Sequence, residues 1–82
     1  MKLEISTHHG NFRETVTLET VYVEPTASIV RRLLMATAYH NTNPDPTNRA
    51  RHVDRILDEL NEQGWSHLGW SYIRLNDTPL PH

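Results

Sequence analysis

Histidine is the residue type in this chain with the clearest metal-binding chemistry, because it occurs six times in 82 residues. Zinc needs several such side chains to converge on one point. His8 and His9 are adjacent, and neighbouring side chains of an extended chain point to opposite sides. The other four show no His-x₃₋₅-His or Glu-x-x-His spacing, and they are His40, His52, His67 and His82. We therefore expect no metal site and no cofactor.

Residues that could perform catalysis are present, but without the surroundings that catalysis needs. The serines at positions 6, 28, 66 and 71 lack a nucleophile-elbow context, and three glycines are too few for a phosphate-binding loop. The absence of cysteine excludes a thiolate nucleophile, a thiolate zinc site and disulfides. Four acids, Asp54, Asp58, Glu59 and Glu62, form a solvated helix face. We expect no enzyme, and the alternative is a small enzyme or metal protein with its site across a dimer interface.

Three arginines stand early in the second predicted helix, while its acids stand late. Arg49, Arg51 and Arg55 precede Asp58, Glu59 and Glu62. The helix dipole favours the reverse order, so helix stability alone does not explain this placement. Arg51 and Arg55 face outward on the helical wheel. They are predicted partner contacts that bind a phosphate or an acidic surface. The alternative is that these are ordinary solvated charges.

The first predicted helix carries an unusual outward stripe. Ser28, Arg32, Met35 and Tyr39 share a face opposite the apolar stripe of the helix. Arg, Met and Tyr are enriched at protein interfaces. Arg32, Met35 and Tyr39 are therefore predicted partner contacts. In the alternative interpretation, Met35 and Tyr39 pack against the following loop or simply lie exposed.

These residues are positioned by a predicted order of two strands, two helices and one strand. Alternating apolar residues predict strands over residues 2–6 and 13–23, joined by a turn at 7–11 into a β-hairpin. Helices are predicted over 27–39, with Thr26 as N-cap, and over 46–63, with Asp45 as N-cap and Gly64 as the stop. A long strand is predicted over 65–75.

This order predicts an α+β fold with ββααβ topology. Two antiparallel helices pack on one face of a three-stranded, mainly antiparallel sheet, with the third strand antiparallel to the second. Residues 1–75 form the single domain and residues 76–82 a C-terminal tail. The helices contribute two apolar stripes to the predicted core: Ile29, Val30, Leu33, Leu34 and Ala36 from the first, and Ala50, Val53, Ile56, Leu57 and Leu60 from the second.

The opposite face of such a sheet is left open. The period-two pattern of residues 65–75 predicts that Trp65, Ile73 and Leu75 lie on this face. An apolar patch of this kind is seldom left in contact with water. A homodimer through this face or through the sheet edge would cover it. The alternative is that the tail, through Leu80, folds across it.

Composition narrows the function further. Leu, Ile, Val and Phe make up 19 of 82 residues, slightly above the level of about one fifth that marks disordered chains. No apolar run is long enough to span a membrane, and the start does not resemble a signal segment, so we expect a cytoplasmic protein. The net charge of −2 argues against a general nucleic-acid binder.

The combined features favour a small non-enzymatic interaction or regulatory module that binds another macromolecule, with a protein as the preferred partner. Small size suggests an accessory protein of phage or bacterial origin. A nucleic-acid-binding regulator that uses the arginines of the second helix is the alternative. Two helices match the outline of a helix-turn-helix, but their connection is long and holds two prolines, Pro44 and Pro46.

Overall fold

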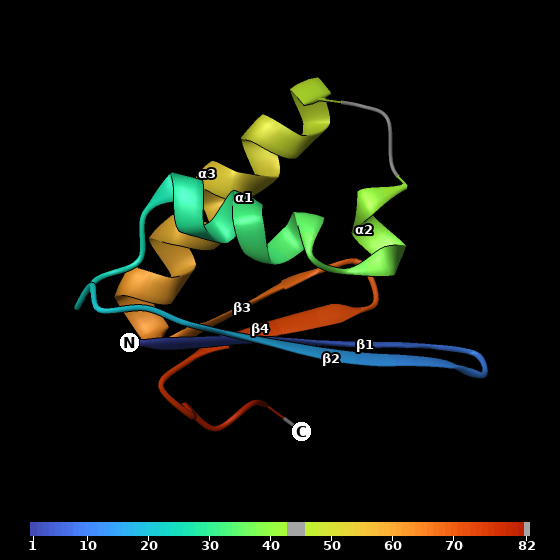
Figure 1. Cartoon of the computed structure of the whole chain (residues 1–82), viewed down its shortest axis with the longest axis horizontal. Helices are drawn as coiled ribbons and strands as arrows, with labels where there is room; N and C mark the ends of the chain where they lie inside the picture. The colour runs from blue at the N-terminus through green and yellow to red at the C-terminus, as the bar shows by residue number, and fades with distance from the viewer. Residues whose placement is uncertain (43–45, 82) are drawn as a thin grey trace.

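The computed structural model describes residues 1–42 and 46–81, and for residues 46–49 it describes only the helical backbone. The described chain forms a four-stranded antiparallel sheet with helices on one face (Figure 1). The predicted α+β class is confirmed. The described chain has four strands and three helices, however, where the sequence predicted three strands and two helices. The elements are β1 (Lys2–His9), β2 (Phe12–Glu19), α1 (Ala27–Met35), α2 (Ala38–Asn41), α3 (Pro46–Gln63), β3 (Trp65–Leu68) and β4 (Ser71–Leu75).

The first hairpin forms as predicted, with different strand ends. β1 runs to His9, so residues 7–9 belong to a strand and not to the turn. Thr7 is fully buried and continues the inward alternation of Leu3 and Ile5. β2 ends at Glu19, and the apolar residues that follow it do not extend the strand.

The predicted strand over 65–75 is instead a second hairpin. The chain reverses at Gly69–Trp70, where Gly69 has φ +57°, a conformation that suits glycine at the first position of a two-residue turn. The strand order is β2-β1-β4-β3, so β4 pairs with β1 and neither new strand pairs with β2.

This turn also changes which side chains share a face. Trp65 pairs with Arg74, and Ser66 pairs with Ile73. Trp65 and Ile73 therefore lie on opposite faces of the sheet. Ile73 and Leu75 pair with Ile5 and Leu3 on the helix-covered face, so their predicted place on the open face is wrong. Only Trp65 of the three predicted self-association residues lies on the open face.

The predicted helix over 27–39 is interrupted after α1. Thr26 caps α1 as predicted, because its hydroxyl accepts from the Ile29 N–H. Thr37 is extended, donates its hydroxyl to the Leu34 carbonyl and accepts from the His40 N–H. A threonine that satisfies backbone groups in this way competes with helix continuation. Thr37 therefore starts a separate short helix, α2.

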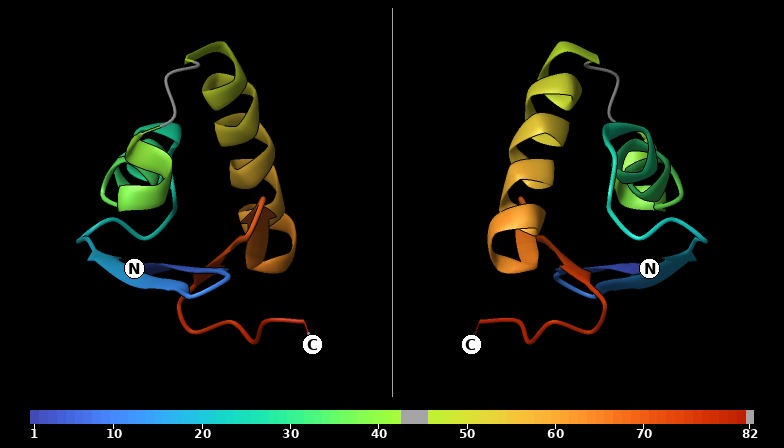
Figure 2. Two further views of the ribbon diagram at one scale, coloured as in Figure 1. Left: turned by 90° about the vertical axis from the view of Figure 1, so that its right-hand side faces the viewer. Right: turned by 90° about the vertical axis from the view of Figure 1, so that its left-hand side faces the viewer.

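The bounds of α3 match the prediction, and Gly64 ends the helix with φ +85°. Asp45, the predicted cap, lies outside the described residues. Figure 2 shows α3 standing upright where α1 is seen nearly end-on, so the helices cross and are not antiparallel. Ala36 and Ala50 are exposed, contrary to prediction, and Leu57 is half-buried. The fully buried core consists of Leu3, Ile5, Ile29, Val30, Leu33, Leu34, Val53, Ile56, Leu60 and Ile73.

The C-terminal tail turns back under the sheet. Asn76 and Asp77 have φ +50° and +60°, a region that Asn and Asp tolerate better than most residues. The Asn76 side chain accepts from the Lys2 N–H at 2.8 Å and fixes this reversal to β1. The tail then runs on the side of the sheet away from the helices (Figures 1 and 2). Among the described residues, none of the helices combines the length and the apolar character that a membrane span requires.

Candidate functional site

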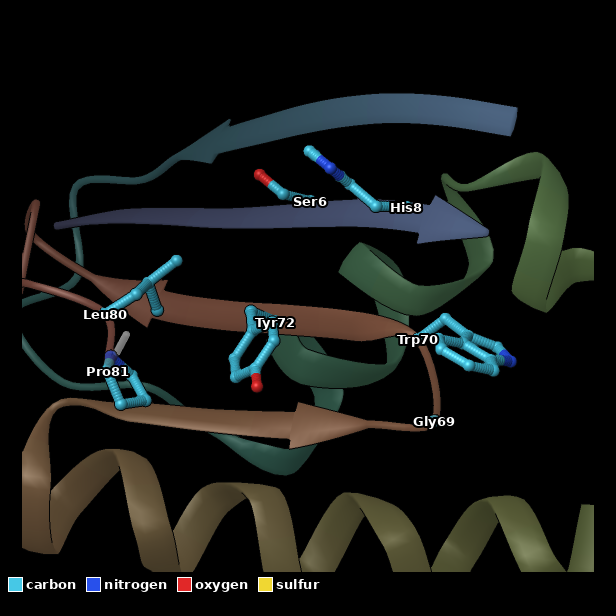
Figure 3. Close-up of a pocket in the computed structure, with 7 residues that line it drawn as sticks. All are labelled: Ser6, His8, Gly69, Trp70, Tyr72, Leu80 and Pro81. Atoms are coloured by element: carbon cyan, nitrogen blue, oxygen red, sulfur yellow. The ribbon is translucent and has the colours of Figure 1, made fainter. Parts of the chain in front are cut away.

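A pocket of about 540 Å³ lies on the open face of the sheet. Figure 3 shows the Tyr72 side chain in its middle, with the tail at one end and Trp70 at the other. β1 supplies the remaining wall. The pocket is lined by Ser6, His8, Gly69, Trp70, Tyr72, Leu80 and Pro81. The combination of aromatic, aliphatic and a few polar groups is typical of sites that bind an organic side chain or small ligand.

Trp70 is the most exposed aromatic side chain at the pocket, with 58 % of its surface in contact with solvent. It is nevertheless held in place. The ring stacks on His9 with centroids 5.0 Å apart and an angle of 17° between the planes. Its position in a two-residue turn also restricts the backbone. Trp70 is therefore a rigid, accessible aromatic group, which loses little conformational freedom when a partner covers it.

Further aromatic rings continue from Trp70 on the helix side. Tyr39 of α2 contacts His9 edge-on at 5.9 Å and Phe12 at 6.1 Å between ring centroids. Phe12 is 39 % exposed. We call His9, Phe12, Tyr39, Trp70 and Tyr72 the aromatic surface. It spans the end of the sheet and shares Trp70 and Tyr72 with the pocket.

The tail covers part of the open face. Leu80 is half-buried and lines the pocket together with Pro81. Farther along, the rings of Trp65, His67 and Tyr72 lie 6.2 to 6.5 Å apart. The tail through Leu80, one of the two covers expected from the sequence, therefore lies on this face. It leaves Trp70 and much of Tyr72 accessible.

A buried polar cluster lies on the other side of the sheet, beneath α2. The Ser71 hydroxyl lies 2.6 Å from the Thr7 hydroxyl and 2.7 Å from His40 Nε2. Burial lowers the pKa of His40, the Glu14 carboxylate opposes this and His52 adds to it. A serine beside a neutral imidazole has the parts of a nucleophile and its base. Ser71 has no exposed surface, however, so the cluster joins α2 to β1 and β4 and presents no hydroxyl to a substrate.

Glu14 ties β2 to this region. Both of its carboxylate oxygens accept from the Ala38 N–H, at 3.1 and 3.0 Å. This N–H belongs to the first turn of α2, where a backbone donor has no partner within the helix. Glu14 thereby fixes the position of α2, which in turn carries Tyr39 and His40.

The structure separates the predicted contact residues of the first helix. Arg32 is exposed on α1, and Met35 is 40 % exposed at its end. Tyr39 belongs to α2, so the predicted continuous stripe is broken at Thr37. Of these three, Tyr39 alone joins the aromatic surface.

The arginines of α3 also have different surroundings. Arg51 is exposed. Arg55 donates to Glu59 Oε2 at 3.0 Å and to the His67 carbonyl at 2.5 Å, so its guanidinium is engaged within the molecule. A hydrogen bond from Ser66 is the main cause that lowers the pKa of Glu59; desolvation opposes it, and the charge of Arg55 lowers the pKa further. The side chain of Arg49 is outside the described part of the chain.

Within residues 1–42 and 50–81, no group of three or more His, Cys, Asp or Glu side chains could hold a metal ion. Comparison of the chain with protein-family models, with curated proteins and with solved structures finds no match. Sequence reasoning missed Trp70, Tyr72, His9 and Phe12, and the Gly69–Trp70 turn is the signal that could have located Trp70.

Proposed function

We propose that the protein is a small binding module that acts by contact with another protein, and that the aromatic surface and the adjoining pocket form the contact site. The observation that carries this proposal is Trp70, which is exposed to solvent but fixed by its stacking on His9. Exposed, preorganised Trp and Tyr residues dominate the binding energy of many protein interfaces.

The chemistry of the pocket favours a protein segment with an apolar side chain. Tyr72, Leu80 and Pro81 supply apolar surface, while Ser6 and His8 supply polar groups at the wall. Nucleic acid is the less favoured partner because the chain has a net charge of −2 and Arg55 is engaged internally. Proteins that bind nucleic acid generally neutralise phosphates with an excess of Lys and Arg.

The proposal is tested by capturing partners from the host lysate with the wild-type protein and with Trp70→Ala. We expect a partner that binds the wild type to bind Trp70→Ala about 30-fold more weakly, since truncation of a central aromatic residue costs about 2 kcal/mol or more. Tyr22→Ala is the matched control, because Tyr22 is 61 % exposed and lies outside the pocket.

Binding is then measured over a range of salt concentrations. A protein partner bound mainly through aromatic contacts should show only modest salt dependence. Equal affinity of the wild type and Trp70→Ala for the captured partner would contradict the proposal. So would a nucleic-acid partner whose affinity falls steeply with the logarithm of salt concentration.

A further inference from the structure

The outer edge of β2 is long and unpaired. β2 is the first strand in the order β2-β1-β4-β3, and its eight residues pair only with β1. The opposite edge, β3, has four residues and is packed against α3. A long free edge is a template for a further strand, and proteins usually block such an edge with proline, lysine or a bulge. β2 contains neither residue type and pairs with β1 in unbroken register.

The alternation of hydrogen bonds between β1 and β2 identifies the backbone groups of β2 that point away from the sheet. The Thr20 N–H donates to the Met1 carbonyl at 3.0 Å, so the backbone N–H and C=O groups of Thr20 point toward β1. Residues of an antiparallel strand alternate in this respect. The N–H and C=O groups of the odd-numbered residues therefore point away from β1, into solvent. These residues are Arg13, Thr15, Thr17 and Glu19, and all four have exposed side chains.

We infer that two copies of the chain pair through β2, antiparallel, about a two-fold axis between their Val16 residues. In this register Arg13 of each copy lies opposite Glu19 of the other, and Thr15 lies opposite Thr17. All four residues carry outward backbone groups, so each opposed pair exchanges two hydrogen bonds. The two four-stranded sheets then form one continuous antiparallel sheet.

Charge selects this register from its neighbours. Two neighbouring registers also keep the odd-numbered residues of the two strands opposite one another. One of them places Arg13 opposite Thr17, and the other places Glu19 opposite Thr15. Both of these registers lose the two Arg–Glu pairs. Within the described residues, neither Arg13 nor Glu19 forms an ion pair with an acid or a base, and the guanidinium of Arg13 forms a hydrogen bond with His8. Cross-strand pairs of opposite charge stabilise a sheet, whereas like charges in the same positions destabilise it.

Apolar groups at the ends of the strand add to the contact. The register brings Phe12, which is 39 % exposed, opposite Thr20 of the second copy. Burial of such side chains favours association. The pocket lies over β1 and β4, so pairing through β2 leaves it accessible in both copies. Phe12 belongs to both the aromatic surface and this contact, whereas Trp70 and the pocket take no part in the pairing, so variants of Trp70 and of β2 test the two proposals separately.

The first test is sedimentation equilibrium of the purified chain from micromolar to millimolar concentration. We expect a mass twice the 9.5 kDa of one chain. Thr17→Pro should be a folded monomer, because proline removes an N–H that points outward and is tolerated on an edge strand. Thr17→Ala should remain dimeric, since it keeps the N–H. A wild-type monomer at all concentrations, or a Thr17→Pro protein that still dimerises, would overturn the inference.

The charge pairs are tested by exchange. Arg13→Glu and Glu19→Arg should each weaken the dimer about tenfold or more, because each variant opposes like charges at two positions. The double variant Arg13→Glu/Glu19→Arg should restore dimerisation. Arg31→Glu, a change at an exposed arginine of α1, should leave it unchanged. Failure of the double variant to recover would contradict the pairing of these side chains.

The register is tested by cross-linking, which is simple because the chain contains no cysteine. Val16→Cys should form a disulfide-linked dimer under mild oxidation, since the two Val16 positions are directly opposed. Leu18→Cys is the matched control on the same face of β2. In this register the two Leu18 positions are displaced by about 13 Å along the strands. Cross-linking of Leu18→Cys in place of Val16→Cys would overturn the assigned register.

Discussion

At the level of single residues, Trp70 and His40 lie on opposite sides of one strand end and play different parts. Trp70 precedes β4 and is exposed, and His40 contacts Ser71, the first residue of β4. The hydrogen bonds of the Thr7, Ser71 and His40 cluster fix the start of β4. Because Trp70 immediately precedes Ser71, this buried cluster also fixes the backbone that presents Trp70 to a partner.

His40 makes the stability of the protein depend on pH. Its pKa is lowered in the folded protein, chiefly by burial, so the unfolded chain binds a proton more readily. The stability that neutral His40 contributes is fully present above about pH 6.5, the pKa of His40 in the unfolded chain. It is lost as pH falls through the lower pKa of His40 in the folded protein. We expect the free energy of unfolding, measured in urea, to fall as pH decreases below about 6.5, and His40→Gln to show a smaller decrease.

Glu14→Gln should change the pH dependence of stability in the direction opposite to His40→Gln. The Glu14 carboxylate raises the pKa of His40 and so limits its depression. Removal of that charge should lower the pKa further and make stability decrease more with falling pH. Glu14 also accepts a hydrogen bond from the Ala38 N–H, so its replacement affects stability at every pH. The comparison with the wild type is therefore made on the change in the free energy of unfolding with pH, and not on its absolute value. An unchanged pH dependence in both variants would contradict this account of His40.

At the level of elements, the junction between α3 and β3 determines where the tail lies. Gly64 ends α3 in a left-handed conformation, and a Cβ atom there would come within 2.7 Å of Thr78 Oγ1. The Thr78 hydroxyl donates to the Leu75 carbonyl at 2.5 Å. Thr78 therefore lies against Gly64, which places the start of the tail beside the end of α3.

Gly64→Ala should therefore destabilise the protein by about 2–4 kcal/mol, from backbone strain and from displacement of Thr78. Gly69→Ala is the control, because Gly69 also has positive φ but has no atom within 4 Å of the added Cβ. It should cost only the strain, about 1–2 kcal/mol. Thermal or urea unfolding measures both values, and equal losses in the two variants would show that the tail is not held at Thr78.

Elements with strong local signals were predictable from the sequence. The period of its apolar residues and the Gly64 stop gave α3 its bounds, and Thr26 marked the start of α1. The second hairpin was missed because Trp65 to Leu75 alternates well enough to resemble one strand. A glycine followed by one residue, between two apolar runs, is a hairpin signal, and Gly69–Trp70 was not recognised as one.

The candidate site was not predicted from the sequence because the second hairpin was missed. With one strand over 65–75, Trp65, Ile73 and Leu75 share a face, and no exposed turn carries Trp70. A two-residue turn reverses the chain and moves Ile73 and Leu75 to the core side. The position of Tyr39 was also misjudged, because Thr37 makes side chain to backbone hydrogen bonds that helical periodicity does not reveal.

At the level of the whole molecule, the fold places its helices on one face of the sheet and leaves the other to the tail. The tail covers one end of that face and lines the pocket there with Leu80 and Pro81, while Trp70 lies at the other end of the pocket, where the aromatic surface continues toward α2. The expected contact residues on the outer helix surfaces, Arg32 and Arg51, lie elsewhere on the molecule, on α1 and α3. A partner that binds the aromatic surface and one that binds these arginines would therefore affect different residues.

The most direct test is a titration of the ¹⁵N-labelled protein, followed by NMR, with the partner captured by the wild type. The largest shifts in the amide signals are expected in residues 6–9 and 69–72, together with the Trp70 indole N–H. Residues around Arg32 and Arg51 should be nearly unaffected. Shifts concentrated on α1 and α3, with the Trp70 indole signal unchanged, would contradict the assignment of the aromatic surface as the contact site.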